Sequence, residues 1–249
     1  MYNFDVKKVT TDCISFIKNF FEVNGNNSNA VLGVSGGKDS SVCAALLKEA
    51  LGANKVIGVL MPCGVQPDIE FSYQLVNDLK IKSFTVNLET TKNALIKELT
   101  ASLEPSKQTL INLMPRLRMS TVYAVSQSVN GRVCNTSNLS ERFVGYSTRY
   151  GDSVGDFAPL FNLTATEVVQ IGDYLGLSNA LTYKIPSDGL TGKTDEDNLG
   201  FLYKDLDLFL RTGVCDTVVK NKIMARHNLN AFKLKPMPAF IPAGIDNVI

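Results

Sequence analysis

The sequence predicts an α/β fold, a three-layer and doubly wound domain whose mainly parallel sheet carries helices on both faces. Short apolar runs alternate with amphipathic segments along the first half of the chain, as in parallel strands joined by crossover helices. The first apolar run ends in a glycine turn, where ligands of such sheets bind. The 249 residues, 45% of them apolar, are enough for one domain, 1–249, with a large core.

The first half of the chain gives the clearest element pattern. Apolar residues at helical spacing predict an amphipathic helix over 4–21, and a Gly/Asn-rich turn follows at 24–29. Three strands and three helices then alternate: strands at 30–34, 55–60 and 82–86, and helices at 40–51, 68–80 and 89–102.

The second half is less regular. A long helical stretch over 106–129 contains Pro115, which should kink it or divide it into two helices. A strand is predicted at 131–135, and Thr164 with Glu167 forms a capping box that opens another helix. The polar segment 186–200 is expected to be a mobile lid loop within the domain. Two helices, near 201–211 and 214–227, close the chain.

Composition argues against several classes of protein. The 25 basic and 24 acidic residues leave a net charge of +1, without the basic excess typical of nucleic-acid surfaces. No signal peptide is expected, because the N-terminal Met-Tyr-Asn-Phe-Asp-Val-Lys-Lys has no apolar h-region, and no membrane span is expected, because no apolar run approaches eighteen residues. Five dispersed cysteines without Cys-x-x-Cys pairing favour reduced thiols, and hence a cytoplasmic protein, over disulfides or zinc.

The turn after the first strand is predicted to bind phosphate. Gly36 and Gly37 allow the backbone to approach an anion closely, and the helix that follows presents free N–H groups. Ser35 and Ser40 can add hydroxyl donors, while Asp39 can hold a cation that phosphate oxygens share. The alternative is an ordinary strand–turn–helix junction.

This loop differs from the common phosphate loops. A Walker loop requires Gly-x4-Gly-Lys-Ser/Thr, but position 32 is Leu and Lys38 is followed by Asp. There is also no Gly-x-Gly-x-x-Gly for a dinucleotide turn. The Gly-Lys-Thr at 192–194 resembles the end of a Walker loop, but Ser187 stands where that loop needs Gly, so this segment is interpreted as part of the lid.

A second polar cluster follows the strand at 131–135. The segments 135–141, 145–152 and 156–160 supply hydroxyls for a nucleotide, carboxylates for a metal and basic groups for phosphate. On its own, this cluster is equally compatible with a structured surface loop.

Together these motifs carry a family resemblance. Ser-Gly-Gly-Lys-Asp-Ser at 35–40 resembles the pyrophosphate loop of the ATP pyrophosphatases, which adenylate a substrate and release pyrophosphate. With the second cluster, Arg-Leu-Arg-Met at 116–119 and the segment 186–196, the chain is similar to the ammonia-dependent NAD synthetases over about residues 10–240. The resemblance implies a Rossmann-like fold of the ATP pyrophosphatase type and a homodimer.

The resemblance also implies a reaction. In that family ATP adenylates the nicotinate carboxylate of deamido-NAD (nicotinic acid adenine dinucleotide), and ammonia then displaces AMP to give NAD. The implied enzyme is therefore a ligase of NAD biosynthesis with ATP as co-substrate and Mg²⁺ as cofactor. Only about thirty residues precede the phosphate loop, too few for a glutaminase domain, so ammonia that is free or comes from a separate protein is expected.

Site residues follow from the same resemblance. The expected catalytic residues are Lys38, Asp39 and Glu141, and Asp39 and Glu141 are also the expected Mg²⁺ ligands. The expected deamido-NAD site consists of Arg116, Arg149, Asp156 and Lys233. The expected ATP site consists of Gly33, Val34, Ser35, Gly36, Gly37, Lys38, Asp39, Ser40, Thr136 and Ser187.

Three positions depart from the usual family pattern. Ala165 stands where relatives often carry Lys, Phe232 begins a triplet that often reads His-Lys-Arg, and Arg149 replaces a common Lys. We hypothesise that Lys38 supplies the charge missing at Ala165.

Two other functions stay open at this stage. Another ATP pyrophosphatase could amidate or thiolate a different nucleotide, but RNA-modifying or GMP-forming enzymes would need an added domain or a catalytic cysteine pair that the sequence does not show. A non-catalytic relative would bind ATP without releasing pyrophosphate, and the retention of both Asp39 and Glu141 argues against it.

Overall fold

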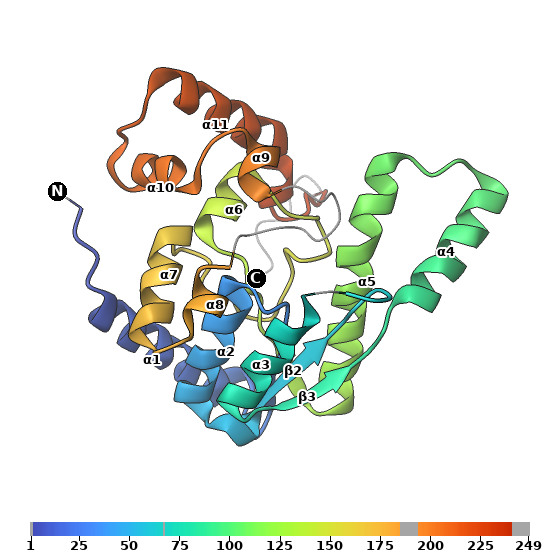
Figure 1. Ribbon diagram of the computed structural model, residues 1–249, viewed down its shortest axis with the longest axis horizontal. Coiled ribbons are helices and arrows are strands. Elements are labelled where there is room, and N and C mark those ends of the chain that lie inside the picture. The colour runs from blue at the N-terminus through green and yellow to red at the C-terminus, as the bar shows by residue number, and fades with distance from the viewer. Residues whose placement is uncertain (1, 67, 185–193, 241–249) are drawn as a thin grey trace.

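The computed structural model describes residues 2–66, 68–184 and 194–240, and within them it forms a four-stranded parallel sheet between helices (Figure 1). The strands are β1 (Asn29–Gly33), β2 (Val56–Leu60), β3 (Lys82–Thr85) and β4 (Gly131–Val133), in the order β3-β2-β1-β4. Val31 is in register with Ile57 on one side and with Val133 on the other. The strand order therefore reverses between β1 and β4, although all strands are parallel. This topological switch point is where such folds bind ligands.

Side chains of each strand alternate between two cores. Ala30 and Leu32 face the layer of α1 (Val6–Asn24), α2 (Lys38–Leu51), α3 (Ile69–Leu79) and α7 (Ala165–Tyr174). Val31 faces the opposite layer, where α5 (Lys107–Ser128) packs on β1 and β4. Burial on both faces explains why these strands are continuously apolar.

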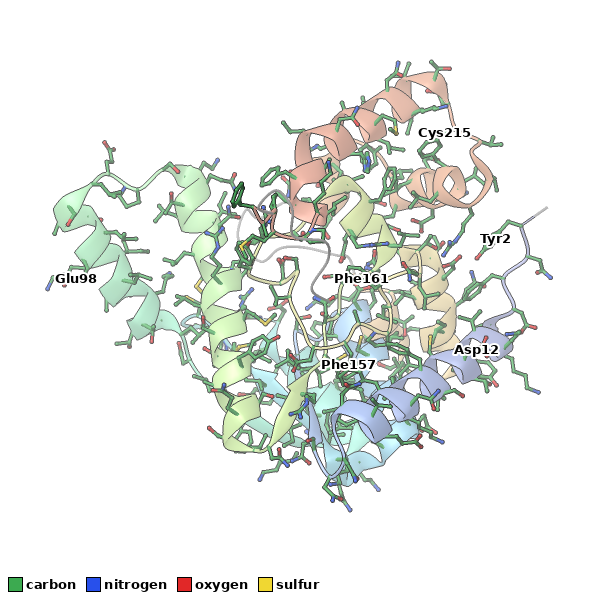
Figure 2. All side chains as sticks on the ribbon, turned by 180° about the vertical axis from the view of Figure 1, so that it is seen from behind. Tyr2, Asp12, Glu98, Phe157, Phe161 and Cys215 are labelled. Carbon is green, nitrogen blue, oxygen red and sulfur yellow. The ribbon has the colours of Figure 1, made fainter. Side chains whose placement is uncertain are left out.

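The remaining elements lie around this sheet. Seen from behind in Figure 2, α4 (Glu89–Ser102) carries Glu98 away from the body of the molecule, and none of its residues is buried. A third core forms where α6 (Leu139–Val144), α10 (Tyr203–Thr212) and α11 (Thr217–Asn230) pack around Leu206 and Ile223. The short elements are η1 (Ala53–Lys55), α8 (Asn179–Thr182), α9 (Asp195–Leu199) and η2 (Ala231–Leu234).

The predicted fold class is confirmed, and so is the capping box at Thr164. A division of the long helix at Pro115 is wrong, because α5 runs through this residue as one element. The segment 148–151 packs against that turn: Thr148 Oγ1 donates to Asn112 Oδ1 at 2.9 Å, and a Cβ built at Gly151 would lie 3.0 Å from the Pro115 ring. The helix thus continues through Pro115, which has no backbone N–H to donate, at a turn where another segment packs against it.

Part of the expected lid is regular structure. Thr194 caps α9 by accepting a hydrogen bond from the Asp197 backbone, so the end of the segment 186–200 is helical and not a loop. The rest of this segment, residues 186–193, lies outside the described residues, and its role as a lid stays a prediction. None of the helices in the described ranges is long and apolar enough to cross a membrane.

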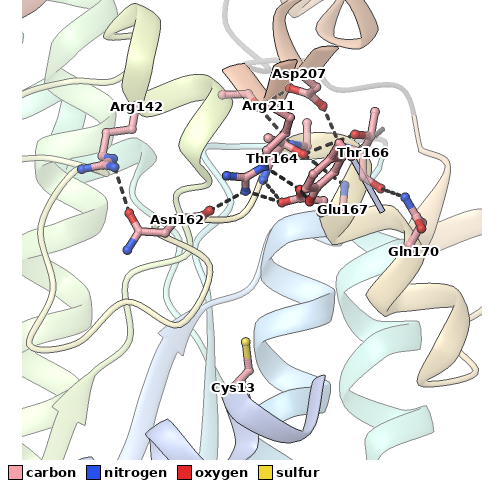
Figure 3. Close-up of polar contacts among 12 residues, drawn as sticks. Cys13, Arg142, Asn162, Thr164, Thr166, Glu167, Gln170, Asp207 and Arg211 are labelled. Carbon is pink, nitrogen blue, oxygen red and sulfur yellow. Dashed lines mark hydrogen bonds and ion pairs between the residues drawn. The ribbon is translucent and has the colours of Figure 1, made fainter. Parts of the chain in front are cut away.

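An ion pair fastens α10 to the start of α7 (Figure 3). Arg211 donates from Nε and Nη2 to the two carboxylate oxygens of Glu167, at 2.7 and 2.6 Å, and the Tyr2 hydroxyl also donates to this carboxylate. Burial alone would raise the pKa of Glu167, but the hydrogen bonds from Arg211 and Tyr2 outweigh it, and the pKa lies below its usual 4.5. The ionised form therefore stabilises the fold.

We predict that Glu167→Gln lowers the free energy of unfolding by about 1.5–3 kcal/mol at pH 7, the usual range for hydrogen bonds to a charged group. Because the native pKa is lowered, this contribution is complete above the unfolded-state value near 4.5 and is lost as the pH falls through the native value. Urea unfolding should show that the difference in the free energy of unfolding between Glu167→Gln and the wild-type protein is smaller at pH 4 than at pH 7. Asp12→Asn, which breaks an exposed pair with Lys8, is the control and should change little. A difference that does not vary with pH would contradict the assignment.

Candidate functional site

The predicted phosphate loop joins β1 to α2. Val34 donates its N–H to the Val59 carbonyl at 2.9 Å, which extends the pairing with β2 by one residue past the end of β1. Inside the loop, the hydroxyls of Ser35 and Ser40 lie 3.1 Å apart, and Gly37 N–H donates to Ser35 Oγ at 3.3 Å. Gly37 is the N-cap of α2. The loop is thus braced by its own hydroxyls at a helix N-terminus, the place where protein backbones bind phosphate.

Gly36 and Gly37 differ in whether the fold leaves room for a larger side chain. Gly36 has a φ of 69°, and a Cβ there would lie 2.6 Å from Phe71 Cβ and 2.8 Å from the Ser72 nitrogen. Gly37 has a φ of −87°, and its Cβ would meet Ser35 Oγ at an ordinary 3.4 Å. The fold therefore requires glycine at position 36, whereas no internal contact requires it at position 37.

Two acidic side chains lie close together beyond the ends of β1 and β4, where the strand order reverses. Asp39 lies in the first turn of α2, and Glu141 lies in the first turn of α6, which follows β4. Asn138, the N-cap of α6, joins them: its Nδ2 donates to Asp39 Oδ1 at 2.9 Å, and its Oδ1 accepts the Glu141 N–H at 3.0 Å. The adjacency of β1 and β4 thus brings together the two carboxylates that the sequence predicted to share an ion.

Lys38 lies among these acidic groups. Its side chain is buried, with Nζ 2.8 Å from Asp39 Oδ2 and 5.5 Å from the centre of the Tyr203 ring. Burial alone would lower the pKa of Lys38, but the charges of Asp39, Glu141 and Asp195 outweigh it and raise the pKa. Lys38 is therefore a permanently charged group that compensates part of the local negative charge.

The donor set fits a hard cation. Burial, and after it the charges of Asp39 and Asp195, raise the pKa of Glu141 to about 8, and a bound cation would favour the ionised form instead. Across residues 2–66, 68–184 and 194–240 no group of three or more His, Cys, Asp or Glu side chains is arranged to hold a metal. Mg²⁺ typically uses one or two carboxylates and completes its shell with water and substrate phosphates. Asp39 and Glu141 suit that mode of binding.

Three of the four residues expected to bind the dinucleotide gather around residues 145–150. Arg116, exposed on α5, donates from Nε to the Arg149 carbonyl at 3.3 Å. The Arg149 guanidinium lies 5.0 Å from the ring centre of Tyr150 and 5.8 Å from that of Phe232. Lys233 Nζ donates to the carbonyls of Gly145 and Ser147, at 2.9 and 3.1 Å.

The other predicted residues lie elsewhere or are not placed. Asp156 accepts hydrogen bonds from the Tyr123 hydroxyl at 3.1 Å and from the Val133 N–H at 2.7 Å, so its described contacts join it to α5 and β4 and not to the group around 145–150. Thr136 is half-buried between β4 and α6. Ser187 lies outside the described residues.

Sequence reasoning missed Asn138, Asp195 and Tyr203. A signal existed for the first, since Asn138 with Glu141 three residues later has the form of a helix N-terminus. No local signal marks Tyr203, because it reaches Lys38 from a distant part of the chain. Asp195 lies in the segment 186–196 that carries the family resemblance, but no local pattern links it to Lys38.

The chain was compared with known proteins. It matches the family described as NAD synthase over residues 9–239. An NH(3)-dependent NAD(+) synthetase of Thermococcus sibiricus is 38% identical over 242 residues, which are 97% of this chain and 94% of that protein. The protein of the same name from Carboxydothermus hydrogenoformans is 43% identical over 192 residues, 76% and 79% of the two chains.

Two solved structures are also similar over nearly the whole chain. NMN synthetase from Francisella tularensis has a TM-score of 0.88 at 29% identity, covering 97% of this chain and all of the other. An NH3-dependent NAD synthetase from Campylobacter jejuni, in complex with the nitrate ion, has a TM-score of 0.79 at 31% identity, covering 96% and 100%.

We predict that Gly36→Ala and Gly37→Ala differ sharply in stability. At position 36 a Cβ costs about 1–2 kcal/mol for the left-handed backbone, and roughly 1–3 kcal/mol more for crowding against α3. At position 37 the change should stay within about 0.5 kcal/mol, as for substitutions without a steric conflict. Urea unfolding of both variants measures this, and equal losses would show that the loop is not shaped as described.

Proposed function

Because the chain belongs to the NAD synthase family, we propose that it is an ammonia-dependent NAD synthetase. It is a carbon–nitrogen ligase that amidates deamido-NAD to NAD with ammonia, converting ATP to AMP and pyrophosphate. The observation that carries the proposal is that Asp39 and Glu141 lie next to the predicted phosphate loop and are joined through the Asn138 side chain.

The first step requires no nucleophile from the protein. The nicotinate carboxylate attacks the α-phosphorus of ATP, and negative charge develops on the departing pyrophosphate. The loop residues Gly33 to Ser40 surround the triphosphate, and the N–H groups at the start of α2 and the Lys38 ammonium stabilise that charge. Thr136 and Ser187 complete the expected ATP site.

Asp39 and Glu141 would hold Mg²⁺, and the cation, when bound, supplies charge neutralisation at the phosphate oxygens. The chain's own part is to keep the two carboxylates close together, joined through the Asn138 side chain. In the second step ammonia attacks the acyl carbon of the adenylate, the carbon–oxygen bond to phosphate breaks, and AMP leaves with that oxygen.

Recognition of the rest of the dinucleotide falls to a basic group. Arg116, Arg149 and Lys233 bring three positive charges around residues 145–150, which suits a diphosphate, and the Asp156 carboxylate suits ribose hydroxyls. We also propose a cytoplasmic homodimer. Exposed apolar side chains on α5 and α11, such as Leu110 and Val218, support an interface on these helices.

A second candidate substrate is the mononucleotide. The NMN synthetase structure of Francisella tularensis has a higher TM-score than the NAD synthetase structure of Campylobacter jejuni, 0.88 against 0.79. NMN contains the same nicotinamide ribotide as NAD, without the adenylate half. The phosphate loop and the acidic pair would serve both reactions, so the choice depends on the basic group.

The purified chain should be mixed with ATP, Mg²⁺ and ammonium, and with either deamido-NAD or nicotinate mononucleotide, and the products separated by chromatography. We expect NAD to form from deamido-NAD with one AMP per NAD, and no NAD when glutamine replaces ammonium. Faster turnover of the mononucleotide would favour the second candidate. ATP binding without AMP formation on either acid would identify a non-catalytic relative.

We predict that Lys38→Ala lowers kcat/KM for ATP by roughly 100-fold, the usual effect of losing one electrostatic donor to a developing anion. The same variant tests the hypothesis that Lys38 supplies the charge missing at Ala165. Lys8→Ala, on an exposed ion pair of α1, is the matched control and should leave the kinetics unchanged. An unchanged KM for ATP together with unchanged turnover in Lys38→Ala would refute the assignment.

A further inference from the structure

A buried carboxylate outside the predicted site connects three helices beside it. Asp207, on α10, is 4% exposed. Its Oδ1 accepts a hydrogen bond from the Ser140 hydroxyl of α6. Its Oδ2 accepts the Thr166 N–H at the start of α7 at 2.8 Å (Figure 3). Ser140 is fully buried, and its Oγ accepts the Ala165 N–H at 3.0 Å. Asp207 and Ser140 together tie α6 to both α7 and α10.

Ser140 directly precedes Glu141 on the same helix. Successive side chains of an α-helix point roughly 100° apart around its axis. A restraint on the direction of Ser140 therefore fixes the rotation of α6 and, with it, the direction of Glu141. This matters because α6 has only six residues and cannot define its own orientation by a long apolar face.

The start of α6 is held by backbone bonds. Leu139 N–H donates to the Leu163 carbonyl at 2.7 Å, and the Asn138 side chain caps the first turn. These contacts fix where the helix begins. The hydrogen bonds of the Ser140 hydroxyl, to Asp207 on α10 and from the Ala165 N–H at the start of α7, anchor a side chain of its first turn to two other helices.

A neighbouring ion pair provides a control that distinguishes positioning of Glu141 from a general contribution to stability. Arg211 and Glu167 also join α10 to α7, on the same two helices, but their described contacts do not reach α6. If Asp207 only held α10 against α7, its loss would resemble the loss of the Arg211 pair. If it orients Glu141, its loss should also weaken cation binding.

We propose that Asp207 is a positioning residue, which holds Glu141 in place beside Asp39 through the Ser140 hydroxyl. The inference rests on the proposed function, since it takes Asp39 and Glu141 as the cation-binding pair. It adds a residue from the C-terminal third of the chain to the machinery of the reaction.

The test compares Asp207→Asn and Ser140→Ala with the control Arg211→Gln. Three quantities are measured for each: the free energy of unfolding in urea, the KM for Mg²⁺ at saturating ATP, and the Kd for Mn²⁺ by spin resonance with and without ATP. We expect Asp207→Asn and Ser140→Ala to raise the KM for Mg²⁺ and the Kd for Mn²⁺ by about 10- to 100-fold, as for residues that orient metal ligands. The kcat at saturating Mg²⁺ should fall much less.

Combining the two substitutions should raise the cation constants by less than the product of the two separate fold-changes, because both weaken the Ser140–Asp207 hydrogen bond. Arg211→Gln should lose stability without a change in either cation constant. The proposal is overturned if the Asp207 and Ser140 variants match Arg211→Gln in all three measurements. It is also overturned if the wild-type protein binds no Mn²⁺ with or without ATP. Failure of the wild-type protein to make NAD would instead refute the proposed function, because Mn²⁺ binding is measured without turnover.

Discussion

Asp39 and Glu141 are two acidic side chains held close together at one edge of a buried sheet, and the surrounding structure offsets their repulsion. Burial, and after it the negative charges of Asp39 and Asp195, raise the pKa of Glu141 to about 8, because its ionised form is disfavoured there. Asn138 offsets part of the cost of ionisation, because its side chain donates one hydrogen bond to the Asp39 carboxylate and accepts the Glu141 N–H at the start of α6. Lys38 supplies a compensating positive charge, with its ammonium 2.8 Å from Asp39 Oδ2.

Topology explains why these groups meet. The strand order β3-β2-β1-β4 makes β1 and β4 neighbours, so the helix starts that follow them point toward the same space. The C-terminal third then closes around this point, with α10 placing the Tyr203 ring beside Lys38 and the Asp207 carboxylate beside Ser140. A buried polar network of this kind is stable only when its members are hydrogen-bonded, and that requirement fixes the positions of the helices that carry them.

Local patterns explain which parts were predictable. The strands and the phosphate loop follow from apolar runs and glycine chemistry, and the capping box at Thr164 from residue spacing, all within short windows. The helix α6 is too short for an apolar period, so only its capping pattern could have revealed it. At Pro115 the expected division of the helix is wrong, and the segment 148–151, which local patterns could not place, packs against Asn112 and Pro115 at this turn. Tyr203 and Asp207 reach the site through the fold alone, and no spacing in the sequence encodes such contacts.

The choice of nucleotide depends on a different physical problem from cation binding. Lys233 already donates to two backbone carbonyls, so contact with a ligand phosphate must share or replace those bonds. Arg149 lies against the rings of Tyr150 and Phe232, which orient a planar group with several donors. Because phenylalanine cannot donate a hydrogen bond where relatives often have histidine, Phe232 can support the guanidinium but cannot itself bind phosphate. Under the proposed function, discrimination between a mononucleotide and a dinucleotide would therefore rest on how these few donors are shared between the backbone and the ligand, while the acidic pair would serve either substrate.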